Sequence, residues 1–77
     1  MSDADTCRAY GWSVGTVLRG TEWGEGWSHT TTIRLTAIGE RSILAVAIEE
    51  DGETLSSLET IWTLSERDWQ EQKAKGG

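Results

Sequence analysis

The sequence predicts a mainly β fold: a small SH3-like antiparallel barrel of four or five strands, with a short C-terminal helical turn. Residues 31–38 alternate apolar and polar side chains, as a strand with one buried face does. Residues 42–48 are almost entirely apolar, which is typical of a strand covered on both faces. Further short β-branched runs, separated by turn signals, flank this pair.

The central element is an antiparallel hairpin over residues 31–48. Successive residues of a strand point to opposite faces, so Ile33, Leu35 and Ala37 share one face and the polar residues between them share the other. Gly39-Glu40-Arg41 is a turn-like break between the two strands.

The elements around the hairpin follow from local signals. Residues 16–19 form a first strand that ends at Gly20, and residues 21–29 form a loop, because Gly24 and Gly26 interrupt any regular pattern. Tyr10 and Trp12 close one end of the core.

Asp51-Gly52 is a turn signal after the second hairpin strand, with the surrounding acidic residues as its solvated tip. Residues 55–58 are either a returning strand or a loop with two anchoring leucines, and residues 60–64 form the last strand. Ser65 and Asp68 have the spacing of a capping box, which predicts a helix start there and places Trp69 on the core.

The length of 77 residues indicates a single domain. We expect a flexible N-terminus over residues 1–9, the barrel over 10–70 and a flexible tail over 71–77, since both ends are polar and unpatterned. Cys7 is the only cysteine, so a disulfide framework is excluded, and Cys7 with His29 cannot form a four-ligand zinc site. A chain this small gains stability from self-association, so we expect a homo-oligomer formed through strand edges.

The net charge of −6 argues against binding to a nucleic-acid duplex, which requires clustered Lys and Arg. An acidic chain suits a basic partner instead. We expect a cytoplasmic protein, because the sequence has no apolar run near the ~20 residues of a membrane span and no signal peptide.

The five tryptophans are too many for the core of a small domain, so some of them should be accessible. Trp23 and Trp27 lie in the predicted loop. They could sandwich a flat ring, or fold down as a lid on the barrel mouth. Arginines could meet a phosphate of such a ligand and nearby threonine hydroxyls could donate further hydrogen bonds. The candidate ligand-binding residues are Trp23, Trp27, Arg19, Arg34, Arg41, Thr30, Thr31 and Thr32.

Three segments carry a family resemblance: residues 11–15 (Gly-Trp-Ser-Val-Gly), 33–40 (Ile-Arg-Leu-Thr-Ala-Ile-Gly-Glu) and 62–69 (Trp-Thr-Leu-Ser-Glu-Arg-Asp-Trp). Together they resemble short uncharacterised proteins encoded by tailed bacteriophages. The resemblance implies a small β fold and a setting in the host cell, and it transfers no catalytic residue. Compact phage proteins of this size often resemble inhibitors of host defence.

Three function classes can be compared. An enzyme is disfavoured, because the sequence has no acid–base constellation, no phosphate-binding loop and no cofactor motif, and Cys7 lacks the basic surroundings of a catalytic thiolate. A module that sequesters a nucleotide-like signalling ligand between indoles at a subunit interface is the first expectation. The alternative is an acidic inhibitor or adaptor that docks a basic host protein, such as a defence protein, with tryptophans as anchors.

Overall fold

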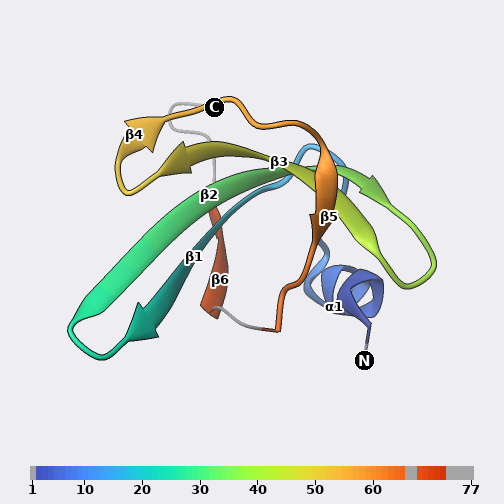
Figure 1. The fold of residues 1–77 in the computed structure, drawn as a ribbon. Coiled ribbons are helices and arrows are strands. Elements are labelled where there is room, and N and C mark those ends of the chain that lie inside the picture. Colours follow the sequence, from blue (N-terminus) through green and yellow to red (C-terminus); the bar gives the residue numbers. More distant parts are fainter. Residues whose placement is uncertain (1, 66–67, 73–77) are drawn as a thin grey trace.

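The computed structural model describes residues 2–65 and 68–72. One N-terminal helix packs against a six-stranded antiparallel sheet with the order β4-β3-β2-β1-β6, and β5 pairs with β3 (Figure 1). The elements are α1 (Asp3–Tyr10), β1 (Val17–Gly24), β2 (Trp27–Ile38), β3 (Ile43–Glu50), β4 (Glu53–Thr54), β5 (Thr60–Trp62) and β6 (Asp68–Gln72). The predicted mainly β class is confirmed. The sheet is open, since β4 and β6 lie at opposite ends of the strand order.

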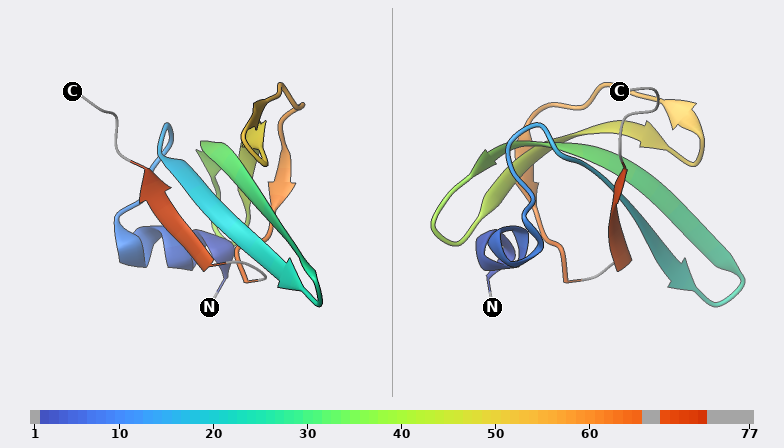
Figure 2. Two further views of the ribbon diagram at one scale, coloured as in Figure 1. Left: turned by 90° about the vertical axis from the view of Figure 1, so that its left-hand side faces the viewer. Right: turned by 180° about the vertical axis from the view of Figure 1, so that it is seen from behind.

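The predicted central hairpin is formed by β2 and β3. Ile33 pairs with Ala47 and Leu35 with Ala45, and all four side chains are buried. Register shifts follow Thr32 and Leu35, and such bulges bend a strand and increase its twist. The sheet is accordingly arched, and α1 lies on its concave side (Figure 2).

Residues 3–10 form a helix with Ser2 as its N-cap, so the flexible N-terminus predicted for residues 1–9 is wrong for the described residues 2–9. The Ser2 side chain accepts a hydrogen bond from the Asp5 N–H, and the Asp5 carboxylate accepts one from the Ser2 N–H, which is a complete capping box. At the other end Gly11 adopts φ 75°, and the Trp12 N–H donates to the Cys7 carbonyl at 2.8 Å. This Schellman-type ending turns Trp12 into the core beside Cys7.

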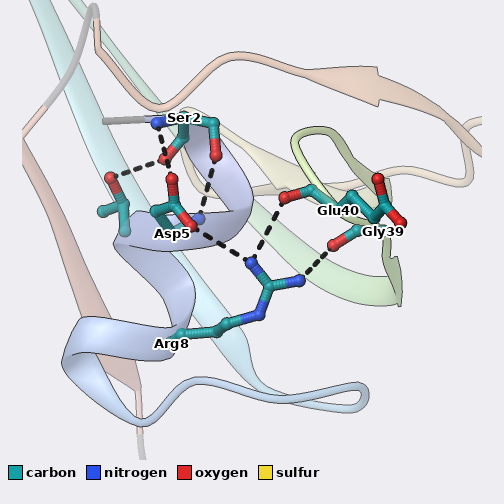
Figure 3. A network of polar contacts seen from close by, with 6 residues as sticks. Ser2, Asp5, Arg8, Gly39 and Glu40 are labelled. Carbon is teal, nitrogen blue, oxygen red and sulfur yellow. Dashed lines mark hydrogen bonds and ion pairs between the residues drawn. The ribbon is translucent and has the colours of Figure 1, made fainter.

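Polar contacts hold α1 to the rest of the chain. The Arg8 guanidinium donates to the carbonyls of Gly39 and Glu40 in the β2–β3 turn (Figure 3). The Ala4 N–H donates to the Arg41 carbonyl at 3.1 Å, and the Leu64 N–H donates to the Asp3 carboxylate at 2.9 Å. The helix is therefore tied both to the central hairpin and to the segment after β5.

The first strand does not end at Gly20, and residues 21–29 are not a loop. β1 continues to Gly24 and β2 begins at Trp27, so that only Glu25 and Gly26 form the turn between them. Gly26 has φ 77°, a conformation that glycine adopts without steric cost. Of the two glycines that suggested a loop, Gly24 is therefore the last residue of β1 and Gly26 lies in the hairpin turn.

The C-terminal segment forms strand β6 rather than the predicted helical turn. β6 pairs with β1, and Gly20 faces Trp69 across this pair. A side chain at position 20 would begin 2.6 Å from the Trp69 ring, so glycine is what lets the indole lie flat on the sheet. The predicted packing of Trp69 on the core is confirmed, and Trp69 is 8% exposed. The predicted helix start at 65–68 lies partly outside the described residues, which omit 66–67, as does most of the predicted tail.

The remaining predictions are partly met. Asp51 and Gly52 both have positive φ, as the predicted hairpin turn requires, and they join β3 to β4. The predicted strand at 60–64 is β5, which is not the last strand. Leu55 packs against the core, but Leu58 is 89% exposed and anchors nothing.

The core lies between α1 and the concave face of the sheet. Ala4 and Cys7 of the helix are fully buried against it, as are Leu18, Ile33 and Ile43 of the sheet. Cys7 is fully buried, and burial raises the pKa of its thiol, which disfavours the thiolate form.

Candidate functional site

The distal part of the β1–β2 hairpin extends beyond the sheet. β1 pairs with β6 only from Val17 to Thr21, and β2 pairs with β3 only from Thr31 onward. In between, residues 22–29 pair only with each other, and we call this two-stranded ribbon the arm. Its tip points away from α1 (Figure 1).

The arm carries two accessible indoles. Trp23 is 67% exposed and Trp27 is 47% exposed, whereas Trp12 and Trp69 are buried. The prediction that some tryptophans stay accessible is confirmed. The alternative that Trp23 and Trp27 form a buried lid is wrong.

The two indoles lie on opposite faces of the arm. Trp23 pairs with Ser28 and Gly24 pairs with Trp27, and residues paired across an antiparallel ladder share a face while successive residues alternate. Trp23 and Trp27 of one chain therefore cannot stack on both sides of the same ring. The sandwich predicted from their spacing is wrong for a single chain, because it assumed a flexible loop where the backbone is a paired ribbon.

The face of Trp27 is the concave side of the sheet. The Trp27 ring occupies the space that a side chain at Gly24 would take, which explains why it is less exposed than Trp23. His29 follows on the same face, with its ring centre 5.3 Å from that of Trp27.

His29 connects the arm to the β3–β4 turn. Its Nδ1 lies 2.8 Å from a carboxylate oxygen of Asp51, whose other carboxylate oxygen accepts a hydrogen bond from the Thr30 N–H at 2.9 Å. The hydrogen bond to Asp51 raises the pKa of His29, with smaller contributions from the charges of Glu50 and Glu22. Sequence reasoning missed this pair, because the two residues are far apart in the chain.

The arm and the β3–β4 turn form an acidic end of the molecule. Residues 20–33 contain Glu22 and Glu25 but no Lys or Arg. The adjoining turn adds Glu49, Glu50, Asp51 and Glu53. Among the described strand residues, the basic residue nearest to the arm in β1 and β2 is Arg19, which is paired with Glu49 at 3.7 Å.

Some of the predicted ligand-binding residues share the face of Trp23. By register these are Arg19, Arg34, Thr30 and Thr32. The hydroxyls of Thr30 and Thr21 are hydrogen-bonded to each other at 3.0 Å, and Thr32 is buried. Arg34 pairs with Val17, six residues along β1 from Trp23, which corresponds to about 20 Å at ~3.3 Å per residue.

The other predicted residues point elsewhere. Thr31 lies on the concave face with Trp27 and is 3% exposed, so its hydroxyl is not available to a ligand. Arg41 lies in the β2–β3 turn beside α1, at the far end of β2 from the arm. The predicted set therefore does not converge on one phosphate-binding site, since Arg34 and Arg41 are both remote from the indoles.

A pocket of about 140 Å³ lies between α1 and β6, lined by Thr6, Tyr10, Trp12, Leu64, Asp68 and Trp69. The sequence placed Tyr10 and Trp12 at one end of the core, and the structure stacks their rings with centres 4.8 Å apart, but Tyr10 remains largely exposed. Among residues 2–65 and 68–72, no three His, Cys, Asp or Glu side chains lie close enough to hold a metal ion.

Fold and site together define a small β protein with an N-terminal helix, an open sheet and an exposed tryptophan-bearing arm. The chain belongs to a family described as a domain of unknown function, DUF7241, which matches residues 1–74. No curated protein and no solved structure matches the chain. No helix in the described part of the chain is long and apolar enough to cross a membrane.

Proposed function

We propose that this protein is a non-enzymatic binding module that docks a basic protein surface through the arm, with Trp23 and Trp27 as its anchors. The observation that carries the proposal is the exposure of both indoles on opposite faces of a ribbon whose residues, within the described sheet, pair as strands only with each other. Trp is enriched among the residues that dominate binding energy at protein interfaces, which favours the arm as an interaction surface.

The arm is suited to insertion between two walls of a partner. An indole on each face lets both sides of the ribbon bury apolar area at once. The His29–Asp51 and Thr30–Asp51 contacts fix the base of the arm, so less conformational freedom is lost on binding than with a flexible loop.

Charge supports a basic partner. The acidic side chains around the arm would attract Lys- and Arg-rich surfaces and raise the association rate. The same charges disfavour the alternative of a sequestered nucleotide, whose phosphates they repel, and the described arginines do not converge to offset that repulsion.

The resemblance to tailed-bacteriophage proteins supplies the proposed setting. The partner would then be a host protein in the bacterial cytoplasm, and a defence protein fits an inhibitor of this size. The homo-oligomer expected from the sequence stays a prediction, for which the outer edge of β6 offers an unpaired side within the described sheet.

The test compares the parent chain with Trp23→Ala/Trp27→Ala as baits for the host proteome at about 50 mM and 500 mM salt, where screening differs strongly. We expect one basic protein to be retained by the parent at low salt, to dissociate as salt rises, and to be lost with the double variant. Leu58→Ala, which removes an apolar side chain outside the arm that is more exposed than either indole, is the matched control and should retain it. Equal retention by the double variant would contradict the proposal.

A further inference from the structure

The pocket between α1 and β6 has aromatic and acidic groups around a volume that the core does not fill. Trp12, Trp69 and Leu64 are buried and form its inner wall, and the exposed Tyr10 and Asp68 lie at its mouth. We name it the aromatic pocket.

We propose that the aromatic pocket is a binding site for an alkylammonium group, such as the end of a lysine side chain, a methylated lysine or a free quaternary amine. Tyr and Trp rings attract cations through their negative faces, and aromatic cages are a general solution for methylated ammonium groups. Asp68 also lines the pocket, so a negatively charged residue that an apolar ligand would not need lies nearby.

The size of the pocket agrees with this class of ligand. A dry cavity of about 150 Å³ can hold benzene, and one water molecule takes about 30 Å³. A pocket of about 140 Å³ therefore admits a group of about six heavy atoms. Drug-sized ligands occupy about 300 Å³ or more, so a nucleotide does not fit.

The sequence builds the pocket through two local features. The helix ending at Gly11 puts Tyr10 and Trp12 side by side, with their rings stacked at an interplanar angle of 18°. Across the pocket, Gly20 allows the Trp69 indole to lie on the sheet, and Trp62 meets that indole edge-on at 6.0 Å. The two buried indoles are thus held in place before any ligand arrives.

The site would deepen the docking proposal, on which this inference rests. A lysine of the basic partner would enter the aromatic pocket while the arm binds another part of the same partner. The pocket and the arm use different residues, so each can be removed without the other. Binding of a small amine also requires no partner protein.

The experiment follows the indole N–H resonances of the full chain during titration with tetramethylammonium chloride. Sodium chloride is the control for ionic strength and tert-butanol is the neutral isostere. The peaks of Trp12 and Trp69 should shift and saturate with tetramethylammonium alone, while the peak of Trp23 should not move. Equal shifts with tert-butanol, or none with tetramethylammonium, would overturn the proposal.

Variants complete the test. Tyr10→Ala should weaken tetramethylammonium binding about three- to fivefold, the range of an exposed cation–π contact, while Tyr10→Phe should keep it. Asp68→Asn should also weaken binding, because it removes a negative charge from the lining. Unchanged affinity in both weakening variants would also overturn it. Since Tyr10 is 68% exposed, its truncation leaves the core in place, and the same spectra report the fold.

Two further outcomes are informative. Saturation by Nα-acetyl-Nζ-trimethyl-lysine methylamide would indicate that the natural ligand is a protein side chain. Saturation by choline alone would indicate a free quaternary amine. Both outcomes support the site. Trp23→Ala/Trp27→Ala should bind tetramethylammonium normally. Failure of the pocket is therefore distinguishable from failure of the arm.

Discussion

Gly20 shows how one residue can determine where a segment distant in the sequence packs. It lies in the interior of β1, where its missing side chain makes room for the Trp69 ring. Glycine in a strand often marks such a close approach. In the sequence alone, Gly20 suggests the end of a strand. The reason for a glycine there is the Trp69 ring, which is far away in the sequence and reaches Gly20 only because β6 pairs with β1.

Replacing Gly20 by Ala should destabilise the protein. The new methyl group would lie 2.6 Å from indole atoms of Trp69, and such overpacking costs about 1–3 kcal/mol. Urea unfolding followed by circular dichroism measures the loss. In a Trp69→Leu background the same substitution should cost less, and an equal cost in both backgrounds would show that the indole is not the cause.

His29 should titrate above its ordinary range. Its folded pKa is raised by Asp51, so the charged pair contributes stability fully below the unfolded pKa of about 6.5 and loses it as pH rises through the folded pKa. Proton NMR titration of the imidazole measures that pKa. Asp51→Asn should lower it toward 6.5, and an identical pKa in parent and variant would refute the pairing.

At the scale of elements, the same short motif leads to two outcomes. Ser2-x-x-Asp5 and Ser65-x-x-Asp68 both have capping-box spacing. The first opens α1, since Ala4 and Cys7 follow at helical spacing and are buried on one side. After the second, Asp68 begins a strand, because Trp69 packs on the core and residues 68–72 pair with the edge of β1. Whether a capping-box sequence starts a helix therefore depends on the tertiary packing available to the residues that follow it.

The cap of α1 can be tested directly. Ser2→Ala removes the side-chain oxygen that accepts from the Asp5 N–H and should cost about 1 kcal/mol of unfolding free energy. Hydrogen bonds from Ser2 also hold the pKa of Asp5 below its ordinary value, so that pKa should rise in the variant. Ser56→Ala, at an exposed position outside the helices and strands, is the control and should change neither quantity.

At the scale of the whole molecule, hydrophobic periodicity was the reliable signal. The alternation over residues 31–38 and the apolar run over 42–48 predicted the central hairpin, because register is strongly specified wherever one face is buried. The extension of β1 and β2 into the arm was not predictable from that signal. The strands of the arm have no buried face and therefore no hydrophobic alternation. The glycines were the strongest local signal, and they predicted a loop.

The candidate site was predictable in part for the same reason. Composition alone indicated that not all five tryptophans could be buried, and the structure exposes Trp23 and Trp27. Which face each one occupies depends on cross-strand register, which the sequence of a polar ribbon does not specify. The aromatic pocket depends on contacts between the two ends of the chain, beyond the reach of any local pattern.

The central claim is that the fold does not need two of its five tryptophans. The unfolding free energy of Trp23→Ala/Trp27→Ala, measured in urea against the parent, tests it without knowledge of any partner. We predict a loss of no more than about 1 kcal/mol, as for exposed positions, whereas the buried control Trp12→Ala should lose about 3–5 kcal/mol. A loss of about 3 kcal/mol or more in the double variant would show that the indoles are structural, and would contradict their role as binding anchors.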